Sequence, residues 1–429
     1  MARVLIYAAD ILPLGDLPAS SGGSRALQLQ RSLERDGHEV HVSCPTETFL
    51  GQSRAAELPA ALTELSWSRH GQARIFEVVQ PDIVIFGSNW GSVEGSWWPD
   101  VPTVLDLCGP VLIEAGLTGE LDAESLNATF RLKLDRLARA DYLLFGGERQ
   151  QWYFRLAMLL AGWDPLQSPP CAVLRLGVDS ELIQPRTWPD EPIFCYAGGL
   201  YPWQDPTLAI LTVLEVIEER GFGRLHWYGG SHSLTKLDRD RQSRISARLV
   251  RSKRAELHGY RGYREICETL RGCSVSVELM ARNMERELAL TTRTPLALGL
   301  GLPVLYPDSS ELGELIRRAD AGWVGSGDDA TEIRAMTEAI LDDPEDIRRR
   351  GENAMRLARD ELAWDRLAEP LLAFCREPSR RPGRRVQPID EDLLRLTTGE
   401  RWILKRLRSP LLAPLRNLVK PLFRPGSGR

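Results

Sequence analysis

Short apolar runs alternate with segments of helical periodicity in the first part of the chain. The apolar runs are candidates for buried strands, because consecutive apolar side chains suit a strand that is covered on both faces. Between them, apolar residues recur every three or four positions, as on one face of a helix. The pattern predicts strands at 4–7, 40–42, 81–86, 103–106 and 141–145, with helices at 24–34, at about 123–140 and after Gly147. This order of strands and helices is typical of a parallel sheet covered by helices.

The same alternation begins again after a proline-rich polar segment at 184–190, which has the composition of an interdomain linker. Further strands are predicted at 192–196, 225–228 and 275–278, and the series ends near Asp343. We therefore predict an α/β protein of two Rossmann-like, doubly wound domains that face a central cleft. The predicted limits are 1–185 and 186–360 for the two domains, 361–378 for a closing helix and 379–429 for a tail. Open sheets of this kind bind ligands outside the carboxyl ends of their strands, so the strand-end loops of both domains would line the cleft.

The composition fits a folded protein and gives no sign of a cofactor. The 429 residues are 43% apolar and 26% charged, as in ordinary globular proteins. The seven cysteines contain no C-x-x-C pair and the six histidines contain no H-x-x-x-H spacing, so neither a disulfide framework nor a metal site is expected. The first residues lack the charged and apolar regions of a secretory signal. We expect a cytoplasmic protein without a metal or other cofactor.

The formal net charge of −5 hides a basic C-terminal end. Residues 376–429 hold 14 Lys and Arg against 5 Asp and Glu. From residue 401 onward, basic residues are interleaved with large apolar residues, and the apolar residues recur at spacings of three and four. Three prolines would break or kink any helix there. A solvated basic tail and a nucleic-acid-binding arm are alternatives, but phosphate binding does not need so many apolar side chains. We therefore expect residues 401–424 to bind an anionic membrane surface at the inner face of the cytoplasmic membrane, and we expect no nucleic acid.

Two glycine turns follow predicted strands and would face the cleft. Gly22 and Gly23 open the first predicted helix, with Arg25 close behind them. Gly198 and Gly199 follow the first strand of the second domain. Backbone N–H groups at such turns can approach a phosphate closely, although an ordinary capped loop explains the first turn equally well.

A third candidate for anion binding lies further along the second domain. Thr291, Thr292 and Arg293 precede an apolar segment that ends at residues 301–304. Hydroxyl groups, unpaired N–H groups and a guanidinium at the start of a helix suit a diphosphate. A simple N-cap beside a surface arginine is the alternative.

These motifs, and the order in which they follow one another along the chain, resemble those of bacterial family 4 glycosyltransferases, which have the two-domain GT-B architecture. The likeness covers roughly residues 3 to 375. It includes Gly22-Gly23-Ser24-Arg25, Gly37-His38-Glu39-Val40, Asp106 with Pro110 and Glu114, Glu148-Arg149-Gln150, Gly177-Val178-Asp179, Gly198-Gly199, Trp203 with Asp205-Pro206, Met284-Glu285-Arg286-Glu287, Gly301-Leu302-Pro303-Val304 and Glu311 to Glu314.

This resemblance implies a glycosyltransferase that moves a sugar, with retention, from a nucleotide-sugar donor to a glycan or lipid-linked acceptor in surface polysaccharide or glycolipid synthesis. The departing nucleotide diphosphate would be stabilised by cationic side chains and helix N-termini without a metal. The implied donor-binding residues are Gly22, Gly23, Arg25, Gly198, Gly199, Thr291, Thr292, Arg293 and Glu314, and the implied catalytic carboxylates are Asp106 and Glu287.

Four positions depart from the family pattern, and one of them is Gly109, which stands before Pro110 where relatives often carry an acidic residue. Leu296 stands where relatives usually carry the glutamate that binds the donor ribose, and Gly199 and Gln204 stand where they commonly carry Arg and Lys. These departures favour, as an alternative, a non-catalytic GT-B scaffold or binding protein. A nucleotide-sugar 2-epimerase, which shares the architecture, is a third hypothesis, and the membrane-suited tail favours the transferase over it.

Overall fold

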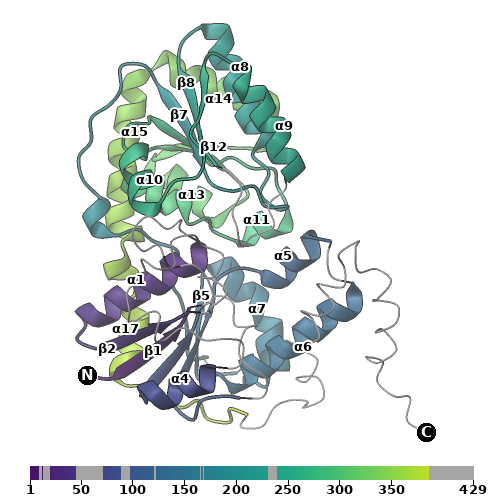
Figure 1. The fold of residues 1–429 in the computed structure, drawn as a ribbon, viewed down its shortest axis with the longest axis vertical. Coiled ribbons are helices and arrows are strands. Elements are labelled where there is room, and N and C mark those ends of the chain that lie inside the picture. The colour runs from purple at the N-terminus through teal and green to yellow at the C-terminus, as the bar shows by residue number, and fades with distance from the viewer. Residues whose placement is uncertain are drawn as a thin grey trace.

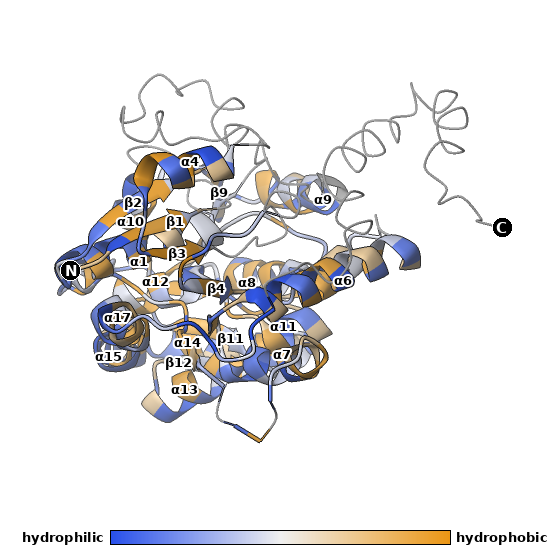
Figure 2. Ribbon diagram, turned by 90° about the horizontal axis from the view of Figure 1, so that it is seen from below, coloured by the Kyte–Doolittle hydropathy of each residue, from blue (hydrophilic) through white to orange (hydrophobic). Residues whose placement is uncertain are grey.

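The computed structural model describes residues 1–8, 12, 20–44, 71–87, 97–119, 122–164, 166–167, 169–229 and 239–385. These residues form two α/β domains that lie one above the other in Figure 1. Figure 2 shows apolar residues gathered on strands such as β1 and β3 and alternating with polar residues along α6.

The first domain contains a six-stranded parallel sheet in the order β2-β1-β3-β4-β5-β6. Its strands are β1 (Arg3–Tyr7), β2 (Glu39–Ser43), β3 (Ile83–Phe86), β4 (Thr103–Leu107), β5 (Tyr142–Phe145) and β6 (Cys171–Val173). Its helices are α1 (Ser21–Arg35), α4 (Gln72–Val79), α5 (Val111–Leu117), α6 (Ala123–Arg139) and α7 (Glu148–Leu160). Because side chains alternate along a strand, Val4 and Ile6 pack with α1, whereas Leu5 and Tyr7 pack with α4, α6 and α7.

The second domain contains another six-stranded parallel sheet, in the order β12-β11-β10-β7-β8-β9. From the β9 edge this is the 3-2-1-4-5-6 order of a Rossmann domain. The strands are β7 (Ile193–Ala197), β8 (Arg224–Tyr228), β9 (Ala255–Leu257), β10 (Val275–Val277), β11 (Val304–Pro307) and β12 (Gly322–Gly325). The helices are α8 (Thr207–Arg220), α9 (Arg239–Val250), α10 (Tyr263–Leu270), α11 (Met284–Leu288), α12 (Arg293–Gly299), α13 (Glu311–Ala319), α14 (Ala330–Asp342) and α15 (Pro344–Leu357).

The chain crosses between the domains twice. The first crossing follows β6 and contains the 3-10 turn η3 (Ser180–Leu182), and the second contains the π-helical turn η4 (Ala358–Leu362) and α16 (Trp364–Leu367). The two crossings pair at one point, where the Val178 N–H donates to the Leu362 carbonyl at 2.9 Å and the Trp364 N–H donates to the Val178 carbonyl at 3.2 Å. The last helix, α17 (Glu369–Arg376), then lies against the first domain (Figure 1). Its Phe374 belongs to the same hydrophobic cluster as Ala26 and Leu29 of α1.

All eight predicted strands and the predicted helices are found, but the first helix starts earlier than predicted. Ser20 caps it, because its hydroxyl oxygen accepts the Gly23 N–H at 3.0 Å, so Gly22 and Gly23 lie in the first helical turn rather than in a loop. Strands β6, β9, β11 and β12 were not predicted. Strand β9 contains Glu256, and β12 begins and ends with glycine, so neither forms an apolar run.

The beginning of the predicted tail lies against the first domain. The Arg381 N–H donates to the Asp141 carboxylate at 2.8 Å, and the Arg384 guanidinium donates to the same carboxylate at 2.6 Å. The predicted membrane-binding segment, residues 401–424, lies outside the described residues. Among the described helices, none combines the length and apolar character needed to cross a membrane.

Candidate active site

A cavity of about 430 Å³ lies between the two domains, and residues of both line it. The first domain contributes the start of α1 and the segment after β4, and the second contributes the end of β8 and the segments after β7, β9 and β10. These are the carboxyl ends of parallel strands, where open α/β sheets bind ligands. The cavity is therefore the expected central cleft.

The start of α1 presents hydroxyl groups to the cavity rather than its glycines. Ser20, Ser21 and Ser24 line the cavity, whereas Gly22 and Gly23 are buried and are not among the lining residues. The Gly23 N–H is already bonded to the Ser20 hydroxyl. Anion binding at this helix start would therefore use the serine hydroxyls and the positive end of the helix dipole.

Arg25 and Asp106 form a buried ion pair at the cavity wall. The Arg25 Nε lies 2.6 Å from the Asp106 Oδ2, and each side chain is 1% exposed. Burial by itself disfavours the charged guanidinium, but the Asp106 carboxylate outweighs that effect and raises the pKa of Arg25. Arg25 lines the cavity and Asp106 does not. Asp106, the expected catalytic carboxylate, thus lies behind Arg25 and would act by positioning it.

Arg293 is held by a similar pair in the second domain. Its Nε lies 3.1 Å from Glu278 Oε2, and its Nη1 donates to the Tyr196 hydroxyl at 3.2 Å. The guanidinium passes so close to Gly198 that a Cβ at that position would lie 2.0 Å from Nη1. Gly198 therefore serves the close approach of Arg293 as well as the turn after β7.

The remaining donor-binding candidates of the second domain also line the cavity. Gly199 lies there beside Gly198, and Thr291 and Thr292 lie there at the start of α12. The Thr291 hydroxyl is within 2.5 Å of the Thr294 hydroxyl. Thr292 is the N-cap residue of α12, but its side chain makes no capping hydrogen bond.

Glu287 and Glu314 lie at a contact between the domains instead of at the cavity. Arg149 of α7 donates from Nη1 to the Glu287 carbonyl at 3.2 Å, and its Nη2 is 3.5 Å from the Glu314 carboxylate. The Arg149 N–H and the Arg175 guanidinium both donate to the Glu311 carboxylate, at 3.1 and 2.9 Å. Neither Glu287 nor Glu314 is among the residues that line the cavity.

The cavity instead contains a carboxyl group that sequence reasoning did not select as a site residue. Glu114 on α5 lines the cavity, and burial raises its pKa to about 7, with the neighbouring Glu285 carboxylate adding to the effect. A carboxyl group that titrates near neutral pH in a cleft is suited to proton transfer. The available signal was its position after Pro110 at the carboxyl end of β4.

Two further charged residues at the cavity appeared in the sequence only within the 284–287 motif and were not selected as site residues. Glu285 and Arg286 are adjacent in sequence and form a two-point ion pair, with Arg286 Nη2 at 2.6 Å from Glu285 Oε1. Both side chains are at least 95% buried and line the cavity. Three arginines therefore face the cavity as members of buried ion pairs: Arg25 with Asp106, Arg286 with Glu285, and Arg293 with Glu278.

Two doubly wound domains that enclose a cavity between the carboxyl edges of their sheets define the GT-B fold, and this chain has that fold. Solved structures of GT-B glycosyltransferases match it over 88% of its length. Sucrose-phosphate synthase from Thermosynechococcus elongatus is 14% identical, with 99% of that chain covered and a TM-score of 0.65. Anabaena Alr3699/HepE in complex with UDP-glucose is 13% identical, with 100% of that chain covered and a TM-score of 0.62. WaaG, described as a glycosyltransferase involved in lipopolysaccharide biosynthesis, is 12% identical, with 100% covered and a TM-score of 0.58.

A comparison with protein-family models finds no match to this sequence, and neither does a comparison with curated proteins.

Proposed function

We propose that this chain is a glycosyltransferase that moves a sugar, expected to be a hexose, from a nucleoside diphosphate donor to a glycan or lipid-linked acceptor. The observation that carries the proposal is the cavity between the carboxyl edges of both sheets. Similar folds include a protein solved with UDP-glucose and one described as acting in lipopolysaccharide biosynthesis, which supports the choice of donor and acceptor classes. Retention of configuration rests on the resemblance to family 4.

In the proposed reaction, the bond between the anomeric carbon and the diphosphate oxygen breaks, and the nucleoside diphosphate leaves with the electron pair. Arg293 and the hydroxyl groups of Thr291 and Thr292 would bind the diphosphate, and Arg25 with the start of α1 would face it from the first domain. An acceptor hydroxyl forms the new bond and loses its proton. Glu114, with a pKa of about 7, would take that proton.

The test is calorimetric titration with UDP-, GDP-, ADP- and dTDP-sugars, followed by analysis of the products by NMR with lipid and glycan acceptors. We expect one donor to bind and to lose affinity in Arg293→Lys, which keeps the charge but not the guanidinium geometry. Arg334→Lys, in an exposed pair with Glu219, is the matched control. Absence of binding to all donors by the folded wild type would contradict the proposal, and conversion of the donor sugar without transfer would favour an epimerase.

One observation favours a second candidate, a non-catalytic GT-B binding protein. Each of the three buried arginine pairs at the cavity is internally neutralised, so none adds a full positive charge for a diphosphate. Leu296 and Gln204, which depart from the family pattern, also line the cavity. Donor binding without any turnover, in the wild type and with every acceptor tested, would support this candidate.

We further propose that the protein associates peripherally with a membrane. Trp152, Leu156, Leu159 and Leu160 form an exposed apolar ridge on α7, with exposed fractions between 50 and 65%, and Leu166 beside the end of the helix is 93% exposed. Apolar side chains of this size, together with the basic tail of the sequence, suit the interface of an anionic bilayer.

Flotation with vesicles that contain phosphatidylglycerol tests the membrane proposal. The Leu156→Gln, Leu160→Gln double variant should float less than the wild type, because it removes apolar area from the ridge. Val250→Gln is the control, since Val250 is 72% exposed at the end of α9 in the other domain. Equal flotation of the α7 and α9 variants would contradict a role for the ridge.

A further inference from the structure

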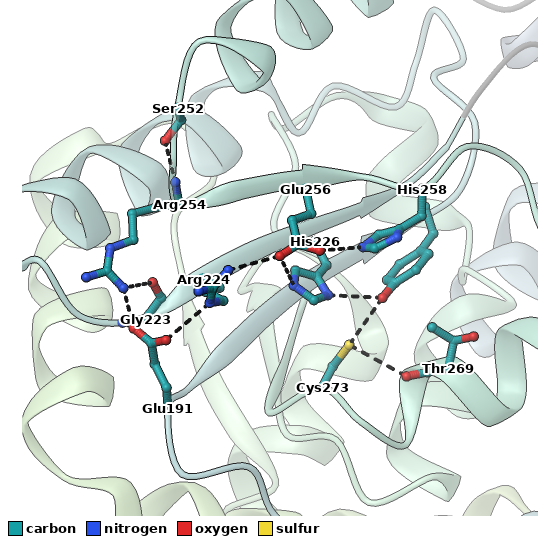
Figure 3. A network of polar contacts seen from close by, with 11 residues as sticks. Glu191, Gly223, Arg224, His226, Ser252, Arg254, Glu256, His258, Thr269 and Cys273 are labelled. Carbon is teal, nitrogen blue, oxygen red and sulfur yellow. Dashed lines mark hydrogen bonds and ion pairs between the residues drawn. The ribbon is translucent and has the colours of Figure 1, made fainter.

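The parallel pair β8 and β9 brings two histidines and a glutamate together on one face of the second sheet. His226 is the register partner of Glu256. His258 lies two positions after Glu256. Its backbone N–H donates to the Trp227 carbonyl at 2.9 Å, so the hydrogen bonds between the two strands continue beyond β9. Because side chains alternate along a strand, the side chains of His226, Glu256 and His258 point to the same side (Figure 3).

Their ligand atoms converge. The His226 Nε2 lies 3.8 Å from Glu256 Oε1, and the His258 Nε2 lies 3.7 Å from Glu256 Oε2. All three ligand atoms lie within 4.8 Å of one another. Tetrahedral ligands at zinc bond lengths of about 2.0–2.1 Å are about 3.3 Å apart, so small side-chain rotations would close the site.

The two Nε2 atoms of this cluster are left without a hydrogen bond at the place where an ion would be bound. Both Nε2 atoms are buried and lack a hydrogen-bond partner. The Nδ1 of His226 lies 3.1 Å from the Tyr228 hydroxyl, the kind of outer contact that orients a metal-binding imidazole and leaves Nε2 as the ligand atom.

Arg224 and Arg261 are cations near this place that would oppose a bound ion, and Arg224 is bonded to Glu256 itself. Arg224 Nη1 donates to Glu256 Oε1 at 3.0 Å, while its Nε donates to Glu191 Oε2 at 3.2 Å. The other carboxylate oxygen, Oε2, faces His258. Oε1 can therefore keep its bond to Arg224 while Oε2 binds the ion. The side chains of His226, Glu256 and His258 are 14, 44 and 24% exposed, which gives an ion a path from solvent.

We propose that His226, Glu256 and His258 form a binding site for a divalent transition-metal ion of the zinc class, with the fourth position taken by water. Two imidazole nitrogens and one carboxylate are a donor set that suits zinc. The ion would join the edge strand β9 to β8. It would thereby fix the start of the segment after His258, in which Tyr260 and Arg261 line the cavity.

The test uses the full chain, freed of metal by chelation and titrated with zinc chloride at pH 7.5 in the calorimeter. We expect saturable 1:1 binding and a rise in Tm with zinc. His258→Gln and Glu256→Gln should each weaken binding at least tenfold, because even outer contacts at metal sites are worth about 10–100-fold. Glu256 is half exposed, so its variant tests the site without disturbing a buried ring. Loss of fold is checked by circular dichroism.

The matched control is His41→Gln. His41 also pairs with a glutamate, Glu39, at 2.9 Å on a strand, but among the described residues no third metal-ligating side chain joins them. Substitution of cobalt identifies the ligands by absorption, because thiolates give a charge-transfer band and imidazoles do not. Absence of 1:1 binding in the wild type, equal binding by His258→Gln and His41→Gln, or a thiolate band would each overturn the proposal.

Discussion

Replacing Glu114 by glutamine removes the negative charge of the cavity carboxyl group and keeps its size and shape, because the amide is nearly isosteric with the protonated acid. Burial raises the pKa of Glu114 from 4.5 to about 7. Each pKa unit corresponds to about 1.4 kcal/mol, so ionising Glu114 in the folded protein reduces the free energy of unfolding by about 3 kcal/mol. A raised acid pKa means that the folded state holds the proton more tightly. Stability is therefore full below pH 4.5 and is lost as the pH rises to about 7.

The assay is urea unfolding of the wild type and Glu114→Gln, followed by tryptophan fluorescence and circular dichroism at pH 5 and pH 8. The variant should be more stable than the wild type by about 3 kcal/mol at pH 8, and by less than about 1 kcal/mol at pH 5. Glu352→Gln is the control. Glu352 is exposed on α15, so this variant removes the same charge from a position in contact with solvent. A difference between Glu114→Gln and the wild type that is the same at both pH values would refute the assigned burial of the charge.

Two further substitutions test the arginine contacts at the cavity. Asp106→Asn should lower the free energy of unfolding by about 3–5 kcal/mol, because it leaves Arg25 buried without its carboxylate. In urea unfolding, the Arg25→Met, Asp106→Leu double variant should lose less than the sum of the two single variants, and simple additivity would argue against the pair. Gly198→Ala should lower stability by about 1–3 kcal/mol, because its Cβ would meet Arg293. In Gly116→Ala the new Cβ would have no atom within 4 Å, so this variant should stabilise α5 by about 0.5–1 kcal/mol. Similar changes in Tm for Gly198→Ala and Gly116→Ala would contradict the close contact between Gly198 and Arg293.

The fold could be predicted from the sequence because buried parallel strands appear as short apolar runs in any context. The strand at Val4 and its neighbours are apolar on both faces, so no knowledge of their partners is needed. The three-residue strands β6 and β9 carry no such signal, and only their pairing with β5 and β8 defines them. The earlier start of α1 follows from Ser20, whose hydroxyl oxygen accepts the Gly23 N–H and caps the helix.

The site was predicted less completely, because the position of a charged group depends on what it pairs with across the fold. Asp106 lies near the end of a strand as predicted, but Arg25 from another element pairs with its carboxylate. The Glu314 carboxylate lies by Arg149 of the other domain, and the Glu287 carboxylate pairs with Arg282, so neither carboxylate lines the cavity. The histidine cluster was missed for a related reason. Spacing along the chain does not detect residues such as His226 and Glu256 that are neighbours across two strands.

The pairing of the two crossings at Val178 has a mechanical consequence. Because the two segments are bonded to each other, they would bend together and act as a single hinge. Rotation about an axis through this pair leaves both hydrophobic cores intact, whereas twisting or sliding of one domain over the other would break the bonds between the crossings. Opening the cavity by this rotation would also separate Glu311 from Arg149 and Arg175. The energy of those ionic contacts would then set the balance between an open form that admits large molecules and a closed form that excludes water.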